Sequence, residues 1–364
     1  MNPYEQYGLY IAGPQCFYPR GYSQWHGHRK LAEFYGFTVV LPNDHSLKLD
    51  HDDPRKNADA IFADLREVIE RTDIIIADLE HFRGTEPDGG TLFEMGMTWA
   101  RGGLLYGYTR DKRPVGAKNP FIHFDADHRI RGRNELGHPY ADMPFVPSIV
   151  ASTMVAEGDF HDGLKMLMAD LDERKKRNHR DPQTDVPEAA FPRTRKRDKK
   201  TVFLSGPARY HDDGAAIYKR MKAVCGTYGY EAVSPLDGAE DLFRGTEDPV
   251  IRACMLFDHW QEQLRSCDIF LGDLNDYNGL EPCGDTAFEA GVAWKLGKEC
   301  YGYMDSASRM LDRIPNRGGH DVAGNVVENF EYPLNLMFSC SMPILSGSFE
   351  HIPELIKAGI PQKR

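Results

Sequence analysis

Residues 72–96 read TDIIIADLEHFRGTEPDGGTLFEMG, and residues 267–291 read CDIFLGDLNDYNGLEPCGDTAFEAG. The two stretches belong to a longer repeat, because residues 62–108 align without gaps to residues 257–303 and share 19 identities in 47 positions. Self-similarity at a fixed offset indicates a duplicated unit. A chain of 364 residues also suits two domains, since single hydrophobic cores stop growing near roughly 250–300 residues. The sequence therefore predicts two copies of one domain.

Each copy alternates short apolar runs with stretches of helical periodicity, which is typical of βαβ units around a parallel sheet. In the first copy we expect strands at 9–12, 38–41, 73–77, 104–108 and 148–152, and helices at 25–35, 58–71 and 94–101. In the second copy we expect strands at 202–205, 231–233, 268–272, 299–303 and 336–339. The predicted fold class is α/β, with two tandem flavodoxin-like or Rossmann-like doubly wound domains, each with a mainly parallel five-stranded sheet.

A basic stretch separates the two copies. Residues 174–200 hold eleven Lys or Arg and four Asp or Glu, so they carry +7 while the rest of the chain carries −18. Three prolines and few apolar residues are typical of a solvated linker. A patch for nucleic acid or an acidic partner is the alternative, although Phe191 is the one aromatic residue there that could stack on a base. We expect a first domain at 1–172, a charged linker at 173–200 and a second domain at 201–364.

The composition excludes several classes of protein. No apolar run reaches the roughly 20 residues that span a bilayer, and the first residues lack the pattern of a secretory signal. The seven cysteines are scattered without a CxxC pair, as expected for reduced thiols in the cytoplasm. A net charge of −11 argues against general binding of nucleic acid. Histidines near 26–28, 51–53 and 211–213 have no third ligand nearby, so we expect no metal site.

Two carboxylates follow the third predicted strand of the first copy. Asp88 stands in a glycine-rich loop, and Glu94 follows six residues later, in the first turn of the next predicted helix. Ligands of parallel sheets bind beyond the carboxyl ends of the strands, so both side chains can converge on one small ligand. The structural alternative is a turn residue and a helix carboxylate favoured by the dipole. However, Glu94 and Glu289 share an apolar Phe-Glu-x-Gly context, where a charge is costly without a task or a partner.

Taken in order, several motifs resemble the nucleoside 2-deoxyribosyltransferase family. They are residues 10–14 at the first strand, 73–78 at the third, 82–96 around the two carboxylates, and the Tyr-Pro-Leu-Asn-Leu-Met stretch at 332–337. The resemblance implies a retaining exchange at the anomeric carbon of deoxyribose without a cofactor. In this reaction a glutamate attacks C1′, the base departs with help from a nearby acid, and an incoming base displaces the glutamate. The implied substrates are a deoxynucleoside and a free nucleobase.

The resemblance also implies catalytic roles for residues of the first copy. Glu94 is the implied nucleophile, and Tyr10 carries the hydroxyl that orients it. Asp88 is the implied partner that hydrogen-bonds the substrate and carries the proton for the leaving base. Asp64 is the acid nearest to a family position that is Leu65 in this chain. A carboxylate nucleophile with a second carboxyl group nearby fits the general logic of retaining glycosyl transfer.

Residues after the first two strands are candidates for substrate binding. Gly13 lies at the carboxyl end of the first predicted strand, and Asp44, after the second, matches a family position near the base. Phe17, Tyr22 and Trp25 can stack on a base, or they can pack in a core or lid. These positions define the expected pocket for the nucleobase.

The second copy has lost most of the implied catalytic set and keeps Glu289. The replacements are Phe203 for Tyr10, His259 for Asp64 and Cys283 for Asp88. In the family, a neighbouring subunit completes each site with an Asn-Leu-Met segment that contacts the sugar hydroxyls. The second copy has that segment, with Asn335 and Met337, and the first copy lacks it. We therefore expect an intramolecular pseudo-dimer with one working site, which could also self-associate; a buried strand with an internally bonded Asn335 is the alternative.

Three functions remain open at the level of the sequence. A transferase moves 2-deoxyribose between bases, whereas a hydrolase of the same superfamily uses water as acceptor and cleaves nucleosides or nucleoside monophosphates. A sensor binds the nucleoside without turnover. The acidic Asp88 and the lack of an Arg cluster beside it favour the transferase, because phosphate recognition relies on such cations. The sequence does not indicate whether purines or pyrimidines are preferred.

Overall fold

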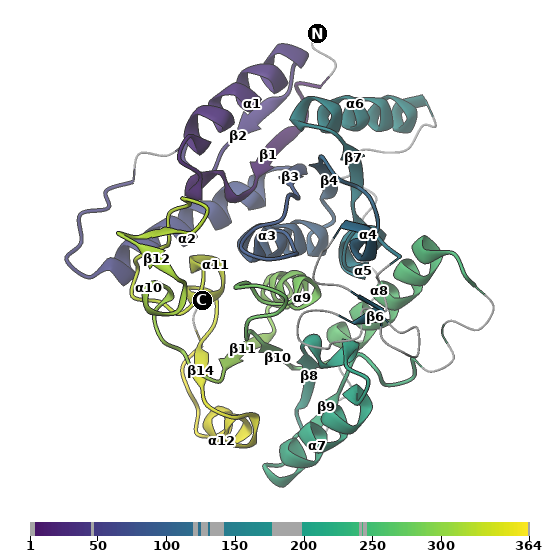
Figure 1. Cartoon of the computed structure of the whole chain (residues 1–364), viewed down its shortest axis with the longest axis vertical. Helices are drawn as coiled ribbons and strands as arrows, with labels where there is room; N and C mark the ends of the chain where they lie inside the picture. The colour runs from purple at the N-terminus through teal and green to yellow at the C-terminus, as the bar shows by residue number, and fades with distance from the viewer. Residues whose placement is uncertain are drawn as a thin grey trace.

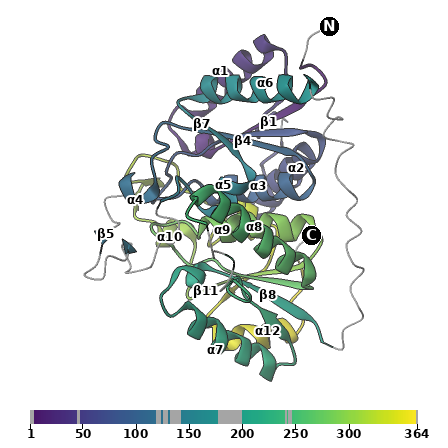
Figure 2. The same cartoon turned by 90° about the vertical axis from the view of Figure 1, so that its right-hand side faces the viewer.

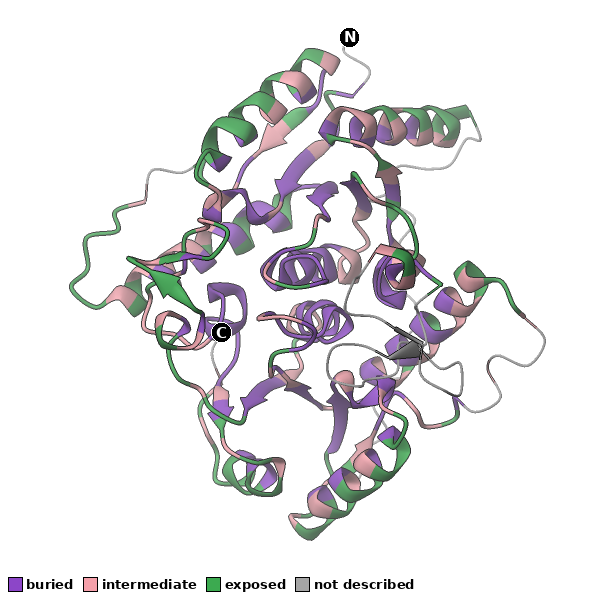
Figure 3. Ribbon diagram, viewed as in Figure 1, coloured by how far each residue is buried: buried purple, intermediate pink, exposed green. Residues whose placement is uncertain are grey.

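The computed structural model describes residues 4–44, 47–118, 123–124, 130–131, 142–176, 199–239, 242 and 246–362. These residues form two α/β domains, one above the other, with the N-terminal domain at the top of Figure 1. The side view in Figure 2 shows a layer of helices between the two sheets and further helices on the outer face of each sheet. The buried residues concentrate in the sheets and in this central helical layer (Figure 3).

The first sheet has the strand order β2-β1-β3-β4-β7, and all its pairings are parallel. The strands are β1 (Gly8–Ala12), β2 (Thr38–Val40), β3 (Ile74–Asp78), β4 (Leu104–Thr109) and β7 (Met154–Glu157). The main helices are α1 (Gly21–Tyr35), α2 (Pro54–Arg71), α3 (Gly89–Ala100) and α6 (Phe160–Lys176). The central strand β3 is buried along its whole length, because helices cover both faces of a doubly wound sheet.

The second sheet repeats this topology as β14-β11-β10-β8-β9. Its strands are β8 (Thr201–Ser205), β9 (Glu231–Val233), β10 (Ile269–Asp273), β11 (Glu299–Met304) and β14 (Ile344–Ser346). Its main helices are α7 (Gly214–Thr227), α8 (Pro249–Ser266), α9 (Gly284–Lys295) and α12 (Ile352–Lys357). The prediction of two tandem doubly wound α/β domains, each with a five-stranded parallel sheet, is confirmed.

The predicted last strand of each copy was wrong. Residues 148–152 and 336–339 lie in short helices, α5 (Pro147–Ser152) and α11 (Leu336–Ser339), and the last strands β7 and β14 follow them. Pro147 at the first helical position and the N-cap Asn335 start these helices. Short apolar runs do not distinguish strand from helix by periodicity alone.

The helix after β3 also begins earlier than predicted. Helix α3 starts at Gly89, so Asp88 is its N-cap and not a residue of a separate loop. Glu94 accordingly lies in the second turn of α3 and not in the first. Helix α6 continues to Lys176, so the first residues of the expected linker, 173–176, are helical. Residues 177–198 lie outside the described part of the chain.

Helices α3 and α9 cross in the centre of the molecule. Ten of the twelve residues of each helix are buried. At the crossing, a Cβ on Gly96 would lie 2.1 Å from the carbonyl oxygen of Phe288, and a Cβ on Gly291 would lie 2.0 Å from that of Phe93. The glycine of each Phe-Glu-x-Gly motif therefore allows the two backbones to touch. One hydrophobic core then runs through this layer, with residues of both copies.

The segments before these helices also contact each other across the domains. Gly84 and Gly279 form an isolated antiparallel bridge. The glutamate of each Gly-x-Glu-Pro motif reaches the first residue of the other domain's central helix. Glu86 accepts a hydrogen bond from the backbone N–H of Gly284, and Glu281 accepts one from that of Gly89. Each domain thereby satisfies an N–H group at the helix start of the other, where such donors lack partners within the helix.

We expect Gly96→Ala to lower the free energy of unfolding by about 1–3 kcal/mol or more, because the new methyl group has to move backbone atoms of α9. Gly27→Ala in α1 is the matched control. A Cβ at Gly27 meets nothing within 4 Å, and alanine there should stabilise the helix by up to about 1 kcal/mol. Denaturant unfolding of both variants measures the difference. Equal stability of Gly96→Ala and the unmodified protein would contradict the packing described.

Candidate active site

A cavity of about 780 Å³ lies at the carboxyl ends of β1, β2 and β3, and both domains line it. The first domain contributes residues around the 3-10 helix η1 (Pro14–Phe17), the start of α1, the segment after β2, α2 and the start of α3. The second domain contributes residues 326–330 and 335–337. The site predicted at the strand ends of the first copy is thus closed by the C-terminal part of the second.

Glu94 lies in this cavity, on the buried helix α3. The hydroxyl of Tyr10, at the centre of β1, donates a hydrogen bond of 2.9 Å to Oε1 of Glu94. Burial raises the pKa of Glu94 to about 8, and the negative charge of Asp88 adds to this rise, while the bond from Tyr10 opposes it. Burial also raises the pKa of Tyr10, so its hydroxyl stays a donor. Both side chains are buried, and the strand and the helix that carry them hold them in contact.

Asp88 is held by the helix that it caps. Its Oδ2 accepts hydrogen bonds from the backbone N–H of Thr91 at 2.8 Å and from the Thr91 hydroxyl at 2.7 Å. Burial raises the pKa of Asp88, and the bonds from Thr91 oppose this rise. Asp88 therefore has a structural role as the N-cap of α3. It also lines the cavity beside Glu94.

The Asn-Leu-Met segment of the second domain reaches the cavity of the first. Asn335 and Met337 both line it. The side-chain oxygen of Asn335 accepts a hydrogen bond of 2.8 Å from the N–H of Met337, which fixes the amide. A Cβ on Gly90 would lie 2.8 Å from both terminal atoms of that amide. Glycine at position 90 thus makes room for Asn335 against the start of α3.

The other predicted substrate-binding residues divide into two groups. Gly13 and Phe17 line the cavity, as do Tyr22 and Trp25. Gly13 has a φ of 150°, and a Cβ there would lie 2.3 Å from Oε1 of Gln15, so this position requires glycine. Asp44 is not among the lining residues. It accepts a hydrogen bond from the N–H of Leu41 and pairs with Arg29, while its neighbours 42 and 43 face the cavity.

Asp64 lies one residue away from the cavity wall. Leu65, its neighbour on α2, lines the cavity, and Asp64 does not. The charge of Asp64 still contributes to the raised pKa of Tyr10, although it is the smallest of the causes. Asp64 is therefore placed to influence the site through its charge and not through contact with a ligand in the cavity.

Sequence reasoning missed two residues of the site. Glu328 of the second domain lines the cavity, and Arg83 of the first domain holds the segment from which Glu328 projects. Glu328 lies outside the ungapped repeat, so no comparison of the copies pointed to it. Arg83 belongs to the repeat but is replaced by Asn278 in the second copy. The difference between Arg83 and Asn278 was the one signal in the repeat that could have indicated a special role for Arg83.

In the second domain, Glu289 is enclosed by its own domain. Arg209 donates to both carboxylate oxygens, at 2.8 and 2.6 Å, and Ser205 donates to one of them. Both side chains of the ion pair are fully buried, and the guanidinium lies 4.4 Å from the ring centroid of Trp260. Arg209 stands where the first copy has Cys16, and Trp260 stands where it has Leu65. Larger side chains therefore fill the space that is open beside Glu94.

The place of Gly90 is also filled in the second domain. Its counterpart is Asp285, which is fully buried. One carboxylate oxygen of Asp285 accepts a hydrogen bond of 2.9 Å from the N–H of Ser148, and the other accepts one from the hydroxyl of Tyr210. Both oxygens of Asp285 therefore have donors, and its side chain fills the place that Gly90 leaves open in the first domain.

A model of the nucleoside 2-deoxyribosyltransferase family matches the chain twice, at residues 9–145 and 202–337. The chain belongs to this family. By this match both copies are nucleoside 2-deoxyribosyltransferase domains. Of their two matching glutamates, Glu94 lines the cavity described above and Glu289 does not. No match was found among curated proteins.

Two solved structures are also similar to this chain. The 2-desoxiribosyltransferase from Leishmania mexicana is 28% identical over 44% of this chain and 99% of its own, with a TM-score of 0.37. The UDP-GlcNAc 2-epimerase from Neisseria meningitidis is 11% identical over 96% of this chain and 90% of its own, with a TM-score of 0.22. Since both TM-scores are low, the family assignment depends on the two matched segments.

Among the helices described, none combines the length and apolar character needed to cross a membrane. Within the same residues, no three His, Cys, Asp or Glu side chains gather as the ligands of a metal ion would.

We expect Glu289→Gln to lower the free energy of unfolding by about 3–5 kcal/mol, because it leaves the charge of Arg209 buried without its partner. The double variant Arg209→Met with Glu289→Gln removes both charges and should recover much of this loss. Denaturant unfolding measures both variants. A single variant as stable as the unmodified protein would argue against the buried pair, and so would a double variant less stable than the single one.

Proposed function

We propose that this protein transfers 2-deoxyribose from a deoxynucleoside to a free nucleobase, with retention of configuration at C1′. The observation that carries the proposal is the position of Glu94: a buried carboxylate that faces a cavity, is hydrogen-bonded by Tyr10 and has Asp88 nearby. A carboxylate nucleophile divides a difficult substitution at a sugar carbon into two easier steps.

In the first step, an oxygen of Glu94 attacks C1′ and the bond between C1′ and the base nitrogen breaks. The electron pair of that bond stays on the base, and Asp88 supplies the proton that the departing base takes up. In the second step, a nitrogen of the incoming base attacks C1′, the ester bond to Glu94 breaks, and the proton of the incoming base returns to Asp88. Two inversions give net retention.

The electrostatics of the site favour the role of Asp88 as proton donor, whereas at Glu94 burial and the bond from Tyr10 act in opposite directions. Burial raises the pKa of Asp88 and therefore favours its protonated form, which a proton donor needs. Glu94 has to be ionised to attack C1′, and the hydrogen bond from Tyr10 favours that form. The same burial that raises the pKa of Glu94 to about 8 also removes water, which would otherwise weaken the ionised carboxylate as a nucleophile.

We propose one working site per chain, built by the two domains as a pseudo-dimer. The first domain supplies Glu94, Asp88 and Tyr10, and the second supplies Asn335 and Met337 for the sugar. In support, Gly90 leaves room for Asn335, whereas the matching glutamate of the second domain is closed off by Arg209. Further self-association of the pseudo-dimer stays a prediction, as does a location in the cytoplasm.

The charge of the cavity favours a neutral nucleoside over a nucleoside monophosphate. Three carboxylates line it, those of Asp88, Glu94 and Glu328, and its described lining includes no Lys, Arg or His. A phosphate group would enter without a cation to pair with. This observation counts against a hydrolase of nucleoside monophosphates among the alternatives.

The proposed function is tested by incubating the protein with a deoxynucleoside and a different free base. We expect a new deoxynucleoside with the same anomeric configuration, identified by chromatography and NMR. Free deoxyribose alone would indicate a hydrolase, and binding without turnover would indicate a sensor; either result would contradict the proposal. Glu94→Ala should abolish exchange, and mass spectrometry of the unmodified protein with substrate alone should show deoxyribose bound to Glu94.

We also expect two residues of the second domain, Asn335 and Glu289, to differ in their importance for exchange. Asn335→Ala should lower kcat/KM by roughly tenfold or more, the effect of losing one or more hydrogen bonds to the substrate. Glu289→Gln, measured per folded protein, should keep the exchange rate close to normal. Equal loss in the two variants would argue against a single site.

Tyr10→Phe should shift the pH profile of exchange. The bond from Tyr10 lowers the pKa of Glu94 relative to burial alone, so its removal raises that pKa, and the acidic limb of kcat/KM moves to higher pH. Activity should therefore fall more at pH 6 than at pH 9. Tyr4→Phe is the control, because the hydroxyl of Tyr4 bonds to Asp172 outside the cavity. An unchanged acidic limb in Tyr10→Phe would contradict the proposed role.

A further inference from the structure

Residues 320–330 of the second domain form one wall of the cavity in the first. This segment includes strand β13 (His320–Asp321) and continues to residues 326–330, all of which line the cavity. The N–H of Val326 donates a hydrogen bond of 2.8 Å to the carbonyl of Phe17 in η1. The wall therefore contacts the first domain beside the aromatic residues expected to face the base.

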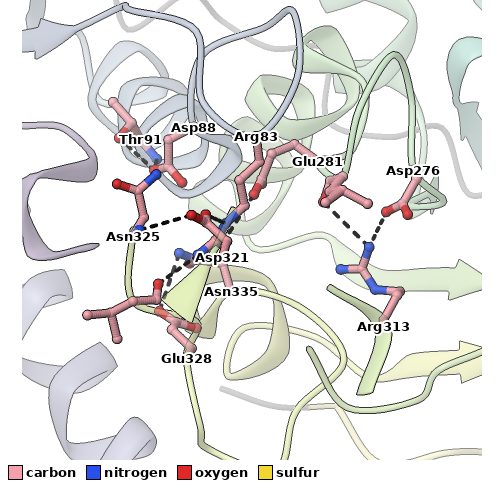
Figure 4. A network of polar contacts seen from close by, with 12 residues as sticks. Arg83, Asp88, Thr91, Asp276, Glu281, Arg313, Asp321, Asn325, Glu328 and Asn335 are labelled. Atoms are coloured by element: carbon pink, nitrogen blue, oxygen red, sulfur yellow. Dashed lines mark hydrogen bonds and ion pairs between the residues drawn. The ribbon is translucent and has the colours of Figure 1, made fainter. Parts of the chain in front are cut away.

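Arg83 fixes this wall to the first domain (Figure 4). Its Nε donates to Oδ2 of Asp321 at 3.1 Å, and its Nη2 donates to the carbonyl of Val326 at 2.7 Å. The guanidinium also lies 3.7 Å from the carboxylate of Glu281. Its side chain is 2% exposed. The buried guanidinium of Arg83 in the first domain thus binds strand β13 and the carbonyl of Val326 in the second domain. Val326 lies two residues before Glu328.

Glu328 projects from this wall toward the Asn-Leu-Met segment. Its Oε2 accepts a hydrogen bond of 3.0 Å from the N–H of Leu336, and its Oε1 lies 3.5 Å from the amide nitrogen of Asn335. Figure 4 shows Glu328 and Asn335 side by side, with Asp88 and Thr91 beyond them. Glu328 therefore fixes the start of the segment that closes the cavity.

The contacts of Glu328 leave Oε1 with capacity for a further partner. A carboxylate oxygen accepts more than one hydrogen bond, and the nearest donor to Oε1, the amide of Asn335, lies at the long limit of such a bond. Burial raises the pKa of Glu328 to about 8, and the charge of Asp88 adds to the rise. Glu328 is thus a half-buried carboxyl group at the cavity wall, and its spare hydrogen-bonding capacity is available to a ligand in the cavity.

We propose that Glu328 hydrogen-bonds a hydroxyl of the substrate's sugar and positions Asn335 for the same sugar. This inference rests on the proposed function. The polar groups at this end of the cavity include Glu94, which attacks C1′ in the proposed reaction, and Asp88 and Asn335, so a sugar bound at Glu94 lies among them. The aromatic and aliphatic lining, from Phe17, Trp25 and their neighbours on α2, is left for the base.

The two candidate hydroxyls are those at C3′ and C5′, and substrate analogues distinguish them. We compare kcat/KM for a 2′-deoxynucleoside with that for its 3′-deoxy and 5′-deoxy analogues. In the unmodified protein, loss of the hydroxyl that contacts Glu328 should lower kcat/KM by roughly ten- to a hundredfold, as for a hydrogen bond to a charged group. In Glu328→Ala, the ratio of kcat/KM between the 2′-deoxynucleoside and the analogue that lacks this hydroxyl should fall close to one. The ratio for the other analogue should remain as in the unmodified protein.

Glu328→Gln keeps the size of the side chain and an oxygen that can accept from Leu336. We expect it to retain part of the discrimination, whereas a role in folding alone would leave discrimination unchanged in every folded variant. Glu331→Gln is the matched control. Glu331 directly follows this segment and pairs with Arg309 at 3.0 Å, outside the cavity lining, so the substitution should leave the ratios unchanged.

Two results would overturn the inference. The first is a folded Glu328→Ala that discriminates against both analogues as the unmodified protein does. The second, if Glu328→Ala does not fold, is full discrimination in Glu328→Gln with only a uniform loss of rate. Dissociation constants for the same three nucleosides, measured in a Glu94→Ala background, give the same ratios without turnover. Failure of exchange with preserved binding ratios would overturn the proposed function and leave the role of Glu328 supported.

Discussion

The direct backbone contact between α3 and α9 determines the rest of the structure. Two helices that meet through Gly96 and Gly291 have no space for side chains at the crossing, so their remaining apolar residues have to pack against the two sheets. This arrangement places the start of α3 deep between the domains. It also brings the second domain's segment 326–337 to the strand ends of the first. The cavity is therefore a product of the helix crossing and not of either domain alone.

The same constraint explains the electrostatics of the site. A carboxylate on a helix buried between two sheets loses its hydration, and the protein replaces it with a few donors: the hydroxyl of Tyr10 for Glu94, and the N–H and hydroxyl of Thr91 for Asp88. These donors reduce but do not cancel the cost of burial, because the pKa values of both acids remain raised. In the second domain the cost is met differently, with Arg209 as a permanent counter-charge for Glu289. One domain keeps a carboxylate that faces a cavity, and the other keeps one that is enclosed in an ion pair.

Much of the fold could be predicted from the sequence because its signals are local and occur twice. The apolar run of β3 and the glycine of the Phe-Glu-x-Gly motif appear in both copies, so each copy supports the interpretation of the other. Prediction failed where two conformations fit the same residues, as at 148–152 and 336–339, which form helices that only their caps could have revealed. Among the proposed site residues, those of the motifs that carry the family resemblance line the cavity or contact Glu94, whereas Asp44 and Asp64 are not among the lining residues. Glu328 and the contacts of Arg83 could not be predicted, because they depend on how two distant segments meet in space.

The position of Asn335 against Gly90 has a consequence for how the site responds to dilution. When separate chains complete each other's sites, the completed fraction depends on protein concentration. Here both partners belong to one polypeptide, so their local concentration is set by the chain itself. The cavity stays assembled in a single isolated molecule, and each half can change its sequence without imposing the same change on the other.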